Sequence, residues 1–330
     1  MKVLITGITG FVGSHLAEYI LEAKPDWEVY GLCRWRSPRE NLVKVFRKVK
    51  LVEGDVNDLG NLIGRLQAVQ PDFVFHLAAQ SNVLASFNSP VTTLWSNVIG
   101  TTNLLEAVRI TGIDPMIHVC SSAEVYGQVT SDDVPIKETC PFRPASPYAV
   151  SKIGEDMVAL QYWLSYKIRT VRSRLFTHTG PRRGEVFALS AFAKQVAASE
   201  LGLQAPVIRV GNLESTRTFC DVRDVTRAYW LLVNQCPPGE VYNIGGNRTM
   251  TIGEALDLLL SFSTSRFEIK LEPKLLRPSD VTLQIPCTDK FTRQTGWKPE
   301  IPLEKTVQDL LEFWRDELRR NPWKVIAVQR

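Results

Sequence analysis

Short apolar runs alternate with longer polar segments along the first half of the chain. The runs are rich in β-branched and aromatic residues, as in strands that are buried on both faces. Apolar residues recur at helical spacing in the segments between them. The pattern predicts strands at residues 2–6, 27–32, 50–53, 73–77, 116–120 and 170–175, and helices at residues 14–23, 95–109 and 152–166. This alternation of strand and helix predicts an α/β fold with a doubly wound parallel sheet.

The pattern becomes less regular after Phe176. One further strand is predicted at residues 241–244, where it would return to the sheet, and helices are predicted at residues 251–260 and 303–318. We therefore expect residues 1–176, with a returning strand at about 241–246, to form the sheet domain. Residues 177–240 and 247–330 would form a smaller C-terminal α/β lobe that binds the substrate.

Composition and charge exclude several classes of protein. The 330 residues are 44% hydrophobic and 22% charged, as in an ordinary globular enzyme. The net charge of +4 comes without a block of Lys and Arg, so no nucleic-acid partner is expected. No run approaches ~20 apolar residues, so no membrane partner is expected. The N-terminus superficially resembles a signal peptide, but its apolar run is short and broken by glycines and no small-residue cleavage site follows.

The six cysteines show no C-x-x-C pair and no zinc-like spacing with histidine. They therefore predict no metal site. Several lie in apolar runs, where a reduced cysteine acts as a small hydrophobic residue. This usage favours a cytoplasmic protein.

A glycine-rich turn follows the first predicted strand. Gly7, Gly10 and Gly13 occur as T-G-x-x-G-x-x-G, immediately before the helix at residues 14–23. Glycine lets the backbone approach a pyrophosphate closely, and the helix N-terminus offers N–H groups to it. The turn therefore predicts a dinucleotide site in a Rossmann fold; the alternative is an ordinary strand-to-helix turn. The residues expected to contact the dinucleotide here are Gly7, Thr9, Gly10, Phe11, Val12 and Gly13.

The second strand is followed by two arginines, Arg34 and Arg36, with no acidic residue between them. In a dinucleotide fold this strand end meets the adenosine ribose, where an acidic residue would favour NAD. Arginine suits a 2′-phosphate, so we expect NADP rather than NAD. The alternative is that both arginines are merely solvated in a loop. Further cofactor contacts are expected after the third and fourth strands, at Asp55, Val56, Leu77, Ala78, Ala79 and Ser81.

The candidate catalytic group lies between residues 120 and 152. Tyr148 and Lys152 are four residues apart, which places them on one face of a helix. A nearby ammonium favours the tyrosine phenolate, so the tyrosine could act as a general base or acid. Ser122 would hydrogen-bond the same substrate oxygen, and Glu124 follows at the end of the same strand. The alternative is that the Tyr–Lys spacing arises by chance and that Glu124 is a surface residue.

Taken together, these motifs resemble the extended short-chain dehydrogenase/reductase family, in its sugar-nucleotide branch. They are T-G-x-x-G-x-x-G, H-L-A-A at 76–79, Ser122 and Tyr148-x-x-x-Lys152. The chain is most similar to GDP-mannose 4,6-dehydratases and to the related GDP-4-keto-6-deoxymannose reductases. That similarity rests on A-A-Q-S at 78–81, S-F at 86–87, G-P-R-R-G-E at 180–185, G-N-L-E-x-x-R at 211–217, D-V-R-D-V at 221–225 and R-P-S-D at 277–280.

The resemblance implies a mechanism of three stages. Tyr148 would remove the proton of the C4 hydroxyl while hydride passes from C4 to the nicotinamide. Glu124 would then remove the C5 proton as water leaves C6, and the hydride would return to C6. The resemblance also implies a homodimer or homotetramer that acts on a GDP-hexose.

The resemblance further implies contacts with the substrate. Arg217 and Arg277 would grip the diphosphate and ribose, Asp280 would contact ribose hydroxyls, and the Arg182–Arg183 loop would reach a neighbouring subunit's cofactor. The full set of expected substrate contacts is Ser86, Ser122, Ala123, Glu124, Thr177, Arg209, Arg217, Arg277 and Asp280.

Two positions depart from the dehydratase pattern. Ala123 stands where dehydratases have the hydroxyl or carboxyl residue of Thr-Ser-Glu or Thr-Asp-Glu, and Thr177 stands where they have asparagine. Three alternatives therefore stay open: an NAD(P)H-dependent reductase of the 4-keto-6-deoxy sugar, a 4- or 5-epimerase, or a cofactor-binding regulator without catalysis.

Overall fold

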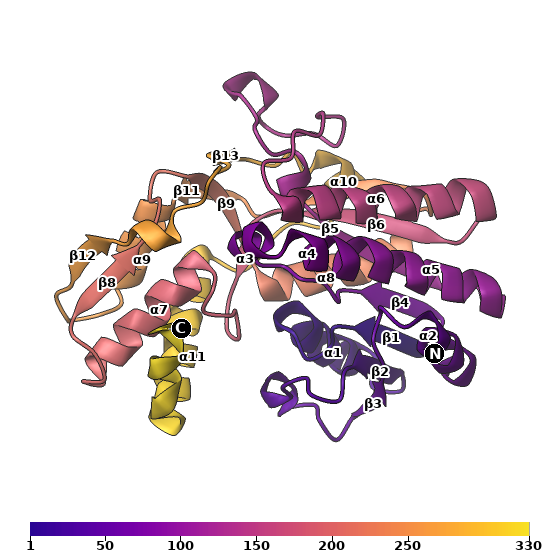
Figure 1. Cartoon of the computed structure of the whole chain (residues 1–330), viewed down its shortest axis with the longest axis horizontal. Helices are drawn as coiled ribbons and strands as arrows, with labels where there is room; N and C mark the ends of the chain where they lie inside the picture. Colours follow the sequence, from indigo (N-terminus) through magenta and orange to yellow (C-terminus); the bar gives the residue numbers. More distant parts are fainter. Residues whose placement is uncertain (330) are drawn as a thin grey trace.

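A seven-stranded parallel sheet forms the centre of the molecule (Figure 1). The computed structural model describes the backbone of residues 1–329 and the side chains of residues 1–325. From one edge to the other the strands are β10 (Val241–Ile244), β6 (Thr170–Leu175), β5 (Met116–Ser122), β4 (Phe73–His76), β1 (Lys2–Thr6), β2 (Glu28–Cys33) and β3 (Val49–Glu53). The predicted doubly wound sheet is confirmed, and its strand order reverses between β1 and β4, where such folds bind ligands.

Helices cover both faces of this sheet. On one face, α2 and α6 both pack against α5, and on the other face α1 packs against α8. Their bounds are α1 (Phe11–Ala23), α2 (Leu59–Val69), α5 (Gly100–Thr111), α6 (Pro147–Tyr166) and α8 (Val222–Gln235). The shorter helices α3 (Val83–Asn88), α4 (Pro90–Leu94) and α10 (Asp289–Thr295) complete the domain. Because both faces are covered, strands such as β6 are buried along their whole length.

The second part of the chain is a smaller lobe beside the carboxyl ends of the strands (Figure 1). Its apolar core is formed by residues of α7, α9 and α11 together with β8. The lobe consists of β7 (His178–Thr179), α7 (Ala188–Glu200), β8 (Val207–Val210), β9 (Thr216–Asp221), β11 (Arg248–Thr251), α9 (Ile252–Leu260), β12 (Glu268–Leu271), β13 (Leu283–Gln284) and α11 (Leu303–Arg320).

The boundary between the two parts differs from the one expected from the sequence. Two segments that we had assigned to the lobe pack into the core of the sheet domain instead. Val225, Tyr229 and Leu232 of α8 share a core cluster with α1 and the sheet. Phe291 of α10 and the nearby Trp297 belong to the same cluster. The apolar face of α8 must be buried, and the sheet face beside α1 is the surface that buries it.

Two helices begin or end differently from the sequence prediction. Helix α6 begins at Pro147 rather than at residue 152, since Ser146 caps it by accepting the Ala149 N–H and proline is favoured at the first helical position. The predicted helix at residues 95–109 is interrupted by a π-helical turn, Trp95–Ile99, between α4 and α5. Within residues 1–329, no helix is both long and apolar enough to cross a membrane.

Candidate active site

The glycine turn brings three pieces of backbone together at the carboxyl end of β1. Gly7 has a left-handed φ of +72°, and a Cβ added there would lie 2.9 Å from the Ala78 nitrogen. A Cβ at Gly13 would lie 2.4 Å from the Gly7 carbonyl oxygen. Only residues without a side chain let the turn, the start of α1 and the loop after β4 approach this closely. The turn therefore has the shape of a pyrophosphate cradle at a helix N-terminus.

Thr6, the residue before this turn, fixes the neighbouring loop. Its hydroxyl oxygen accepts the N–H groups of Leu77 and Ala78, each at 3.1 Å, and lies 2.9 Å from His76 Nδ1. His76 Nε2 lies 2.9 Å from the Thr101 hydroxyl, so both ring nitrogens have partners. Burial lowers the pKa of His76 to about 3, which keeps the ring neutral. The loop after β4 is thus held against the glycine turn by buried hydrogen bonds.

The end of β2 presents positive charge without acidic partners. Arg34 and Arg36 are both exposed, directly after the buried Cys33. The Arg36 guanidinium lies 4.3 Å from the ring centre of Trp35. In the part of the chain that the structure describes, neither arginine takes part in an ion pair. Guanidinium groups in this state suit a phosphate on the adenosine ribose.

Tyr148 and Lys152 lie together at the buried end of α6. Tyr148 is in the first turn, and its N–H donates to the Ser86 hydroxyl at 3.1 Å. The Lys152 ammonium lies 5.9 Å from the Tyr148 ring centre and donates to the Cys120 carbonyl at 2.9 Å. It also donates to the Glu155 carboxylate at 2.8 Å. Both members of the pair are therefore fixed at the end of β5, as their helical spacing predicted.

The ionisation of Tyr148 is set by two opposing effects. Burial raises the pKa of the phenol above its usual value, and this effect outweighs the lowering by Lys152 and by the Ser122 hydroxyl. The lysine acts in the expected direction, but the burial of the phenol cannot be read from the sequence. In the protein alone the phenol therefore holds its proton at neutral pH.

Ser122 and Glu124 lie in a short turn at the end of β5. The Ser122 hydroxyl accepts the Glu124 N–H at 3.2 Å, which fixes the turn. The Glu124 carboxylate accepts a hydrogen bond from Gln284 of β13 at 3.1 Å. Gln284 pairs in register with Arg217 of β9. Glu124 is therefore held where the sheet domain meets the lobe.

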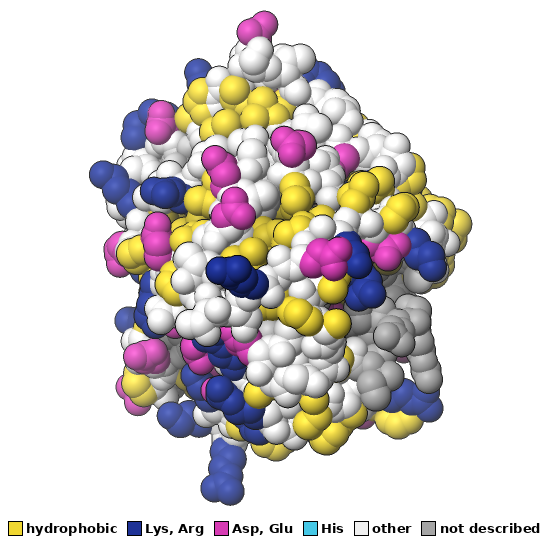
Figure 2. All heavy atoms as spheres, turned by 90° about the vertical axis from the view of Figure 1, so that its left-hand side faces the viewer, with side chains coloured by type: hydrophobic (Ala, Val, Ile, Leu, Met, Phe, Trp, Pro, Cys, Tyr) yellow, Lys and Arg dark blue, Asp and Glu magenta, His cyan; other side chains and the backbone are white. Residues whose placement is uncertain are grey.

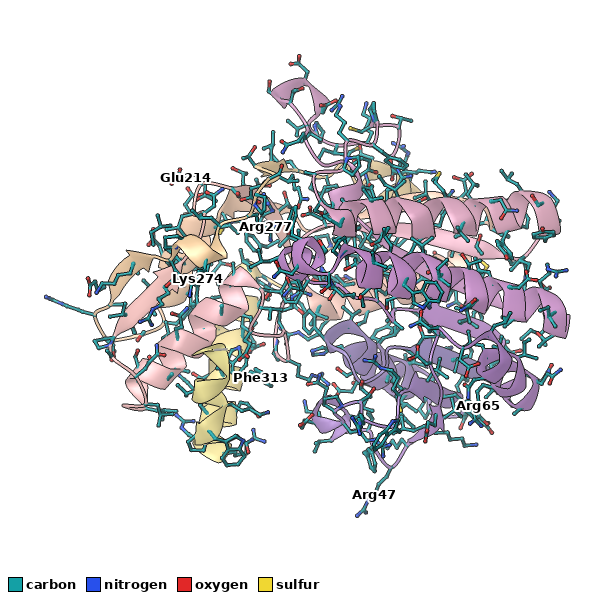
Figure 3. The ribbon with its side chains drawn as sticks, viewed as in Figure 1. Arg47, Arg65, Glu214, Lys274, Arg277 and Phe313 are labelled. Atoms are coloured by element: carbon teal, nitrogen blue, oxygen red, sulfur yellow. The ribbon has the colours of Figure 1, made fainter. Side chains whose placement is uncertain are left out.

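Two arginines of the lobe, Arg217 on β9 and Arg277 in the loop before β13, lie near the carboxylate of Asp280. Arg217 is 7% exposed, and its guanidinium donates to the Val281 carbonyl at 2.5 Å. Burial lowers the pKa of Arg217, while Glu124 and Asp280 act in the opposite direction. Asp280 lies 3.4 Å from Arg277 and 4.0 Å from Arg217. Both guanidinium groups thus lie around one carboxylate. Figure 3 labels Arg277 on the side of the lobe that faces the sheet domain.

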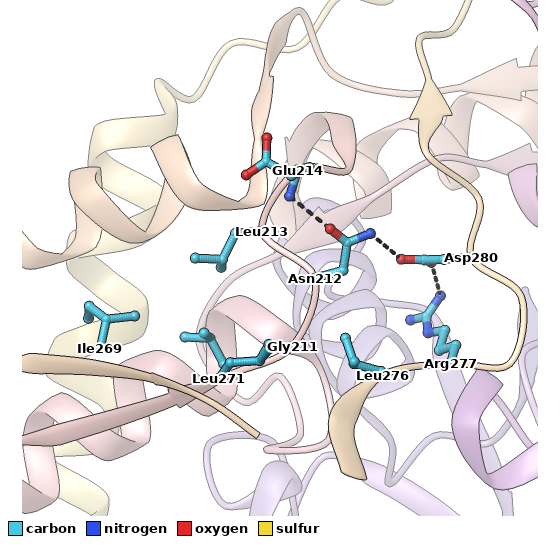
Figure 4. A pocket seen from close by; sticks show the side chains of 10 residues that line it. Gly211, Asn212, Leu213, Glu214, Ile269, Leu271, Leu276, Arg277 and Asp280 are labelled. Carbon is cyan, nitrogen blue, oxygen red and sulfur yellow. Dashed lines mark hydrogen bonds and ion pairs between the residues drawn. The ribbon is translucent and has the colours of Figure 1, made fainter. Parts of the chain in front are cut away.

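A cavity of about 570 Å³ adjoins these arginines (Figure 4). One part is apolar and the other part carries the hydrogen-bonded chain from Asn212 through Asp280 to Arg277. Figure 2 shows the side of the molecule that carries the lobe, where apolar side chains form a band interspersed with charged ones. The lining residues are Val210, Gly211, Asn212, Leu213, Glu214, Ile269, Leu271, Leu276, Arg277 and Asp280. Such a mixture fits a flat base with a charged tail.

Comparison with known proteins then decides the family. The model of the GDP-mannose 4,6 dehydratase family matches residues 4–310. The chain belongs to the GDP-mannose 4,6-dehydratase family. The resemblance inferred from the motifs is thereby confirmed.

Relatives within and around this dehydratase family cover nearly the whole chain. GDP-6-deoxy-D-mannose reductase of Pseudomonas aeruginosa is 33% identical over 320 residues, covering 97% of this chain and 99% of the relative. GDP-mannose 4,6-dehydratase of Yersinia enterocolitica is 32% identical over 351 residues, covering 94% and 92%. The solved structure of RMD from Pseudomonas aeruginosa, complexed with NADPH, has a TM-score of 0.83 at 31% identity, covering 96% and 99%.

Several residues expected at the dehydratase site lie elsewhere. Ser86 is fully buried, donates to the Val83 carbonyl and accepts the Tyr148 N–H, so it positions the helix rather than the substrate. Ala123 is 2% exposed and packs into a core cluster, so its methyl group does not face the site. Arg209 is exposed on β8 and does not line the cavity.

The Arg182–Arg183 loop also differs from expectation, because both side chains contact their own chain. Arg182 pairs with Glu18 at 2.8 Å, and Arg183 lies 5.0 Å from the Phe11 ring centre. The expected role of this loop at a neighbouring subunit's cofactor remains a prediction. Asp280, which was expected to contact ribose hydroxyls, accepts hydrogen bonds from Asn212 and Ser215. These bonds order the loop that carries Arg277.

The remaining expected contacts lie in the glycine turn and in the segments that follow β3, β4 and β6. Val12 packs beside the core, and the Thr9 carbonyl accepts a hydrogen bond from Asn41. Ser81 is exposed in the loop that follows β4. Val56 is buried, and one Asp55 oxygen accepts from the Asn57 N–H at 2.9 Å. Thr177 is half-buried between β6 and β7. No structural observation assigns these residues a ligand, and their roles remain predictions.

Three polar residues of the site were missed from the sequence. Glu155 pairs with Lys152, and Gln284 holds Glu124. Asn97 lies in the π-helical turn, where its amide bonds both the N–H and the carbonyl of Gln80. The helical spacing of Glu155 from Lys152 could have revealed the first, and no sequence signal marks the other two.

Proposed function

We propose that this protein is a GDP-mannose 4,6-dehydratase that uses NADP. The reaction would convert GDP-mannose to GDP-4-keto-6-deoxymannose. The observation that carries the proposal is the position of Glu124, held by Gln284 at 3.1 Å at the junction of sheet and lobe, on the same turn as Ser122. A carboxylate there serves a reaction that must remove a carbon-bound proton, and simple reduction has no use for it.

The residues present fit NADP. The Gly7 and Gly13 positions leave a cradle that a Cβ would fill. Arg34 and Arg36 offer exposed guanidinium groups at the ribose end, with no ion-pair partner among the described residues. The glycine turn and the N-terminus of α1 would hold the pyrophosphate. When bound, the nicotinamide accepts and returns hydride.

The residues of the chain would supply proton transfer and orientation. Tyr148 would take the proton of the C4 hydroxyl, with Ser122 hydrogen-bonded to the same oxygen. Tyr148 acts in this step as the phenolate, and the Lys152 ammonium would favour the phenolate that accepts this proton. Glu124 would remove the C5 proton, which the 4-keto group has made acidic. In the absence of a donor at Ala123, Glu124 would pass this proton to the leaving C6 oxygen, which departs as water. When the hydride returns to C6, C5 would regain a proton, and the proton taken from the C4 hydroxyl balances it.

The cavity at the lobe would hold the nucleotide. Apolar side chains of β12 would contact the base, while Arg217 and Arg277 would face the diphosphate. The name of the family model and the names of relatives in this family support a GDP-linked hexose.

A second candidate is a reductase of the 4-keto-6-deoxy sugar. Two observations favour it: the Ala123 side chain is buried, and burial keeps the Tyr148 phenol protonated, as a general acid requires. In that case Tyr148 would donate its proton to the C4 oxygen, and Glu124 would have no chemical role. An NADPH-dependent reductase would also use the same cradle.

One assay separates the two candidates. Purified protein is incubated with GDP-mannose without added cofactor, and the product mass is followed. Loss of one water supports the dehydratase, while turnover only with the 4-keto sugar and NADPH supports the reductase. For Glu124→Gln we expect unchanged GDP-mannose binding and no loss of water, with the exposed Glu304→Gln as the matched control. Product formation by Glu124→Gln at the wild-type rate would remove Glu124 from the mechanism.

We also infer a homodimer or homotetramer in the cytoplasm. The family resemblance supports the assembly, and the free state of all six cysteines supports a reducing compartment. Light scattering of the purified protein tests the first point, and a monomer at micromolar concentration would contradict it.

A further inference from the structure

Glu155 is a buried acidic residue for which the proposed mechanism has no role. It lies on α6, one turn beyond Lys152, and is 2% exposed. One carboxylate oxygen accepts from the Lys152 ammonium at 2.8 Å. The other oxygen, Oε1, is buried and has no hydrogen-bond partner in the described part of the chain. A buried carboxylate with an unsatisfied oxygen is costly, so its presence requires an explanation.

The explanation lies in the geometry of the lysine. An ammonium group has three N–H donors. One donates to the Cys120 carbonyl at 2.9 Å and one to Glu155 at 2.8 Å. Because the nitrogen is tetrahedral, these two bonds fix the direction of the third N–H. Without Glu155 the ammonium could rotate about its stem.

The ionisation of Lys152 also depends on Glu155. Burial alone would lower the pKa of Lys152, but the carboxyl of Glu155 and the phenol of Tyr148 outweigh it, and the pKa is raised. A lysine as buried as this one, at 4% exposure, would otherwise lose its proton easily. Only a charged lysine can stabilise the Tyr148 phenolate. Burial raises the pKa of the Glu155 carboxyl to about 7, even though Lys152 acts in the opposite direction. The carboxylate is therefore charged in the alkaline range where the lysine would lose its proton, and there it protects the charge on which the dyad depends.

We propose that Glu155 is a positioning residue that keeps the Lys152 ammonium charged and oriented toward Tyr148. The catalytic dyad is thus a linear triad along one face of α6, in which Glu155 acts through the lysine and does not touch the substrate. For its link to turnover, this inference rests on the proposed function; the pairing itself does not.

The other titratable groups around the pair do not compete with this role. Burial lowers the pKa of both His76 on β4 and His118 on β5 to about 3, so both stay neutral above that range. Burial raises the pKa of the Cys120 thiol. Asp156, the next residue of α6, is itself paired with Arg172 and Arg174.

The direct test is an NMR titration of the protein with NADP bound. Lysine is labelled with ¹³C at Cε, and the Lys152 signal is assigned by its loss in Lys152→Met. We expect wild-type Lys152 to titrate above the ordinary lysine value of about 10.4. In Glu155→Gln the midpoint should fall by at least about one pH unit, because burial is then no longer offset. Glu155→Asp keeps the charge and should fall between the two.

Turnover gives a second measurement. In Glu155→Gln the fall of kcat at alkaline pH should begin at lower pH, with KM little changed, and Glu155→Asp should restore part of the wild-type range. Asp156→Asn breaks the neighbouring ion pair and serves as the matched control, with reduced stability and an unmoved pH profile.

Three results would overturn the proposal. They are a wild-type Lys152 that titrates below its ordinary value, an unchanged Lys152 midpoint in Glu155→Gln, or an equal loss of kcat at every pH. The first result is measured on the wild-type protein. The proposal can therefore still be refuted if the Glu155→Gln protein fails to fold. Absence of turnover by the wild type would count against the proposed function alone, since the NMR titration does not depend on it.

Discussion

Gly13→Ala tests whether the glycine turn is the cofactor cradle. The added Cβ would lie 2.4 Å from the Gly7 carbonyl oxygen and 2.8 Å from the Ile8 Cα. Both contacts are with backbone atoms, so no side-chain rotation can relieve them. Gly7 is already fixed by its left-handed φ of +72° and its contact with Ala78. The turn must therefore open, and the pyrophosphate would lose its close approach to the backbone.

The cost follows from the size of the overlap. One methyl group forced into a well-packed site costs about 1–3 kcal/mol. If the whole cost falls on the cofactor-binding conformation, NADPH affinity should fall by about 5- to 150-fold, since 1.4 kcal/mol is one factor of ten. Titration of NADPH fluorescence measures the affinity, and urea unfolding of the cofactor-free protein measures how much of the cost falls on folding.

Gly64→Ala is the matched control. No atom lies within 4 Å of a Cβ added at Gly64, an exposed position inside α2. Alanine in a helix interior should stabilise the protein by about 0.5–1 kcal/mol and leave NADPH binding unchanged. A Gly13→Ala protein with the affinity and the stability of wild type would refute the assignment of the cradle.

Three other predictions concern charge. Arg34→Ala combined with Arg36→Ala should weaken NADP binding by at least about tenfold while sparing NAD, since charged hydrogen bonds contribute about 1.5–3 kcal/mol each; an unchanged NADP/NAD ratio in parallel titrations would contradict the 2′-phosphate role. Asp156→Asn should lower the free energy of unfolding in urea by about 3–5 kcal/mol, because the carboxylate is fully buried between two arginines; a loss below about 1 kcal/mol would show that the network is replaceable. Burial lowers the pKa of His76 and of His118 from 6.5 to about 3, so the unfolded chain binds more protons below pH 6.5 and stability falls as pH falls. Each should cost about 2 kcal/mol between pH 7 and pH 5, and equal unfolding midpoints at both values would exclude this linkage.

The elements that the sequence predicted well are those with strong local signals. Strand β1 begins and ends where its apolar run does, because a parallel strand buried on both faces favours continuous apolar residues. Strand β6 also has the predicted bounds, although it contains Arg172 and Arg174, which are buried through their ion pairs with Asp156. The glycine turn was recognised because its spacing between strand and helix is required by the backbone. Helix α8 was not predicted as a helix, and its residues were assigned to the lobe, because only packing against α1 shows which part of the structure buries them.

The site was predictable where one element carries it. Tyr148 and Lys152 share one helix, so their contact follows from helical spacing alone. The bond between Glu124 and Gln284 joins residues 160 positions apart, and no local pattern indicates it. Burial was equally invisible, which is why Ser86 was taken for a substrate contact and the net direction of the Tyr148 pKa was missed.

The chain returns to the sheet after its first passage through the lobe. This path limits how the protein can be recombined with its relatives. After β6 the chain enters the lobe, comes back to place α8 and β10 on the sheet, and crosses again before β11. A chimera that imports another enzyme's lobe therefore has no single splice point. It must exchange separate segments and retain β10, since otherwise β6 would become an open sheet edge prone to aggregation.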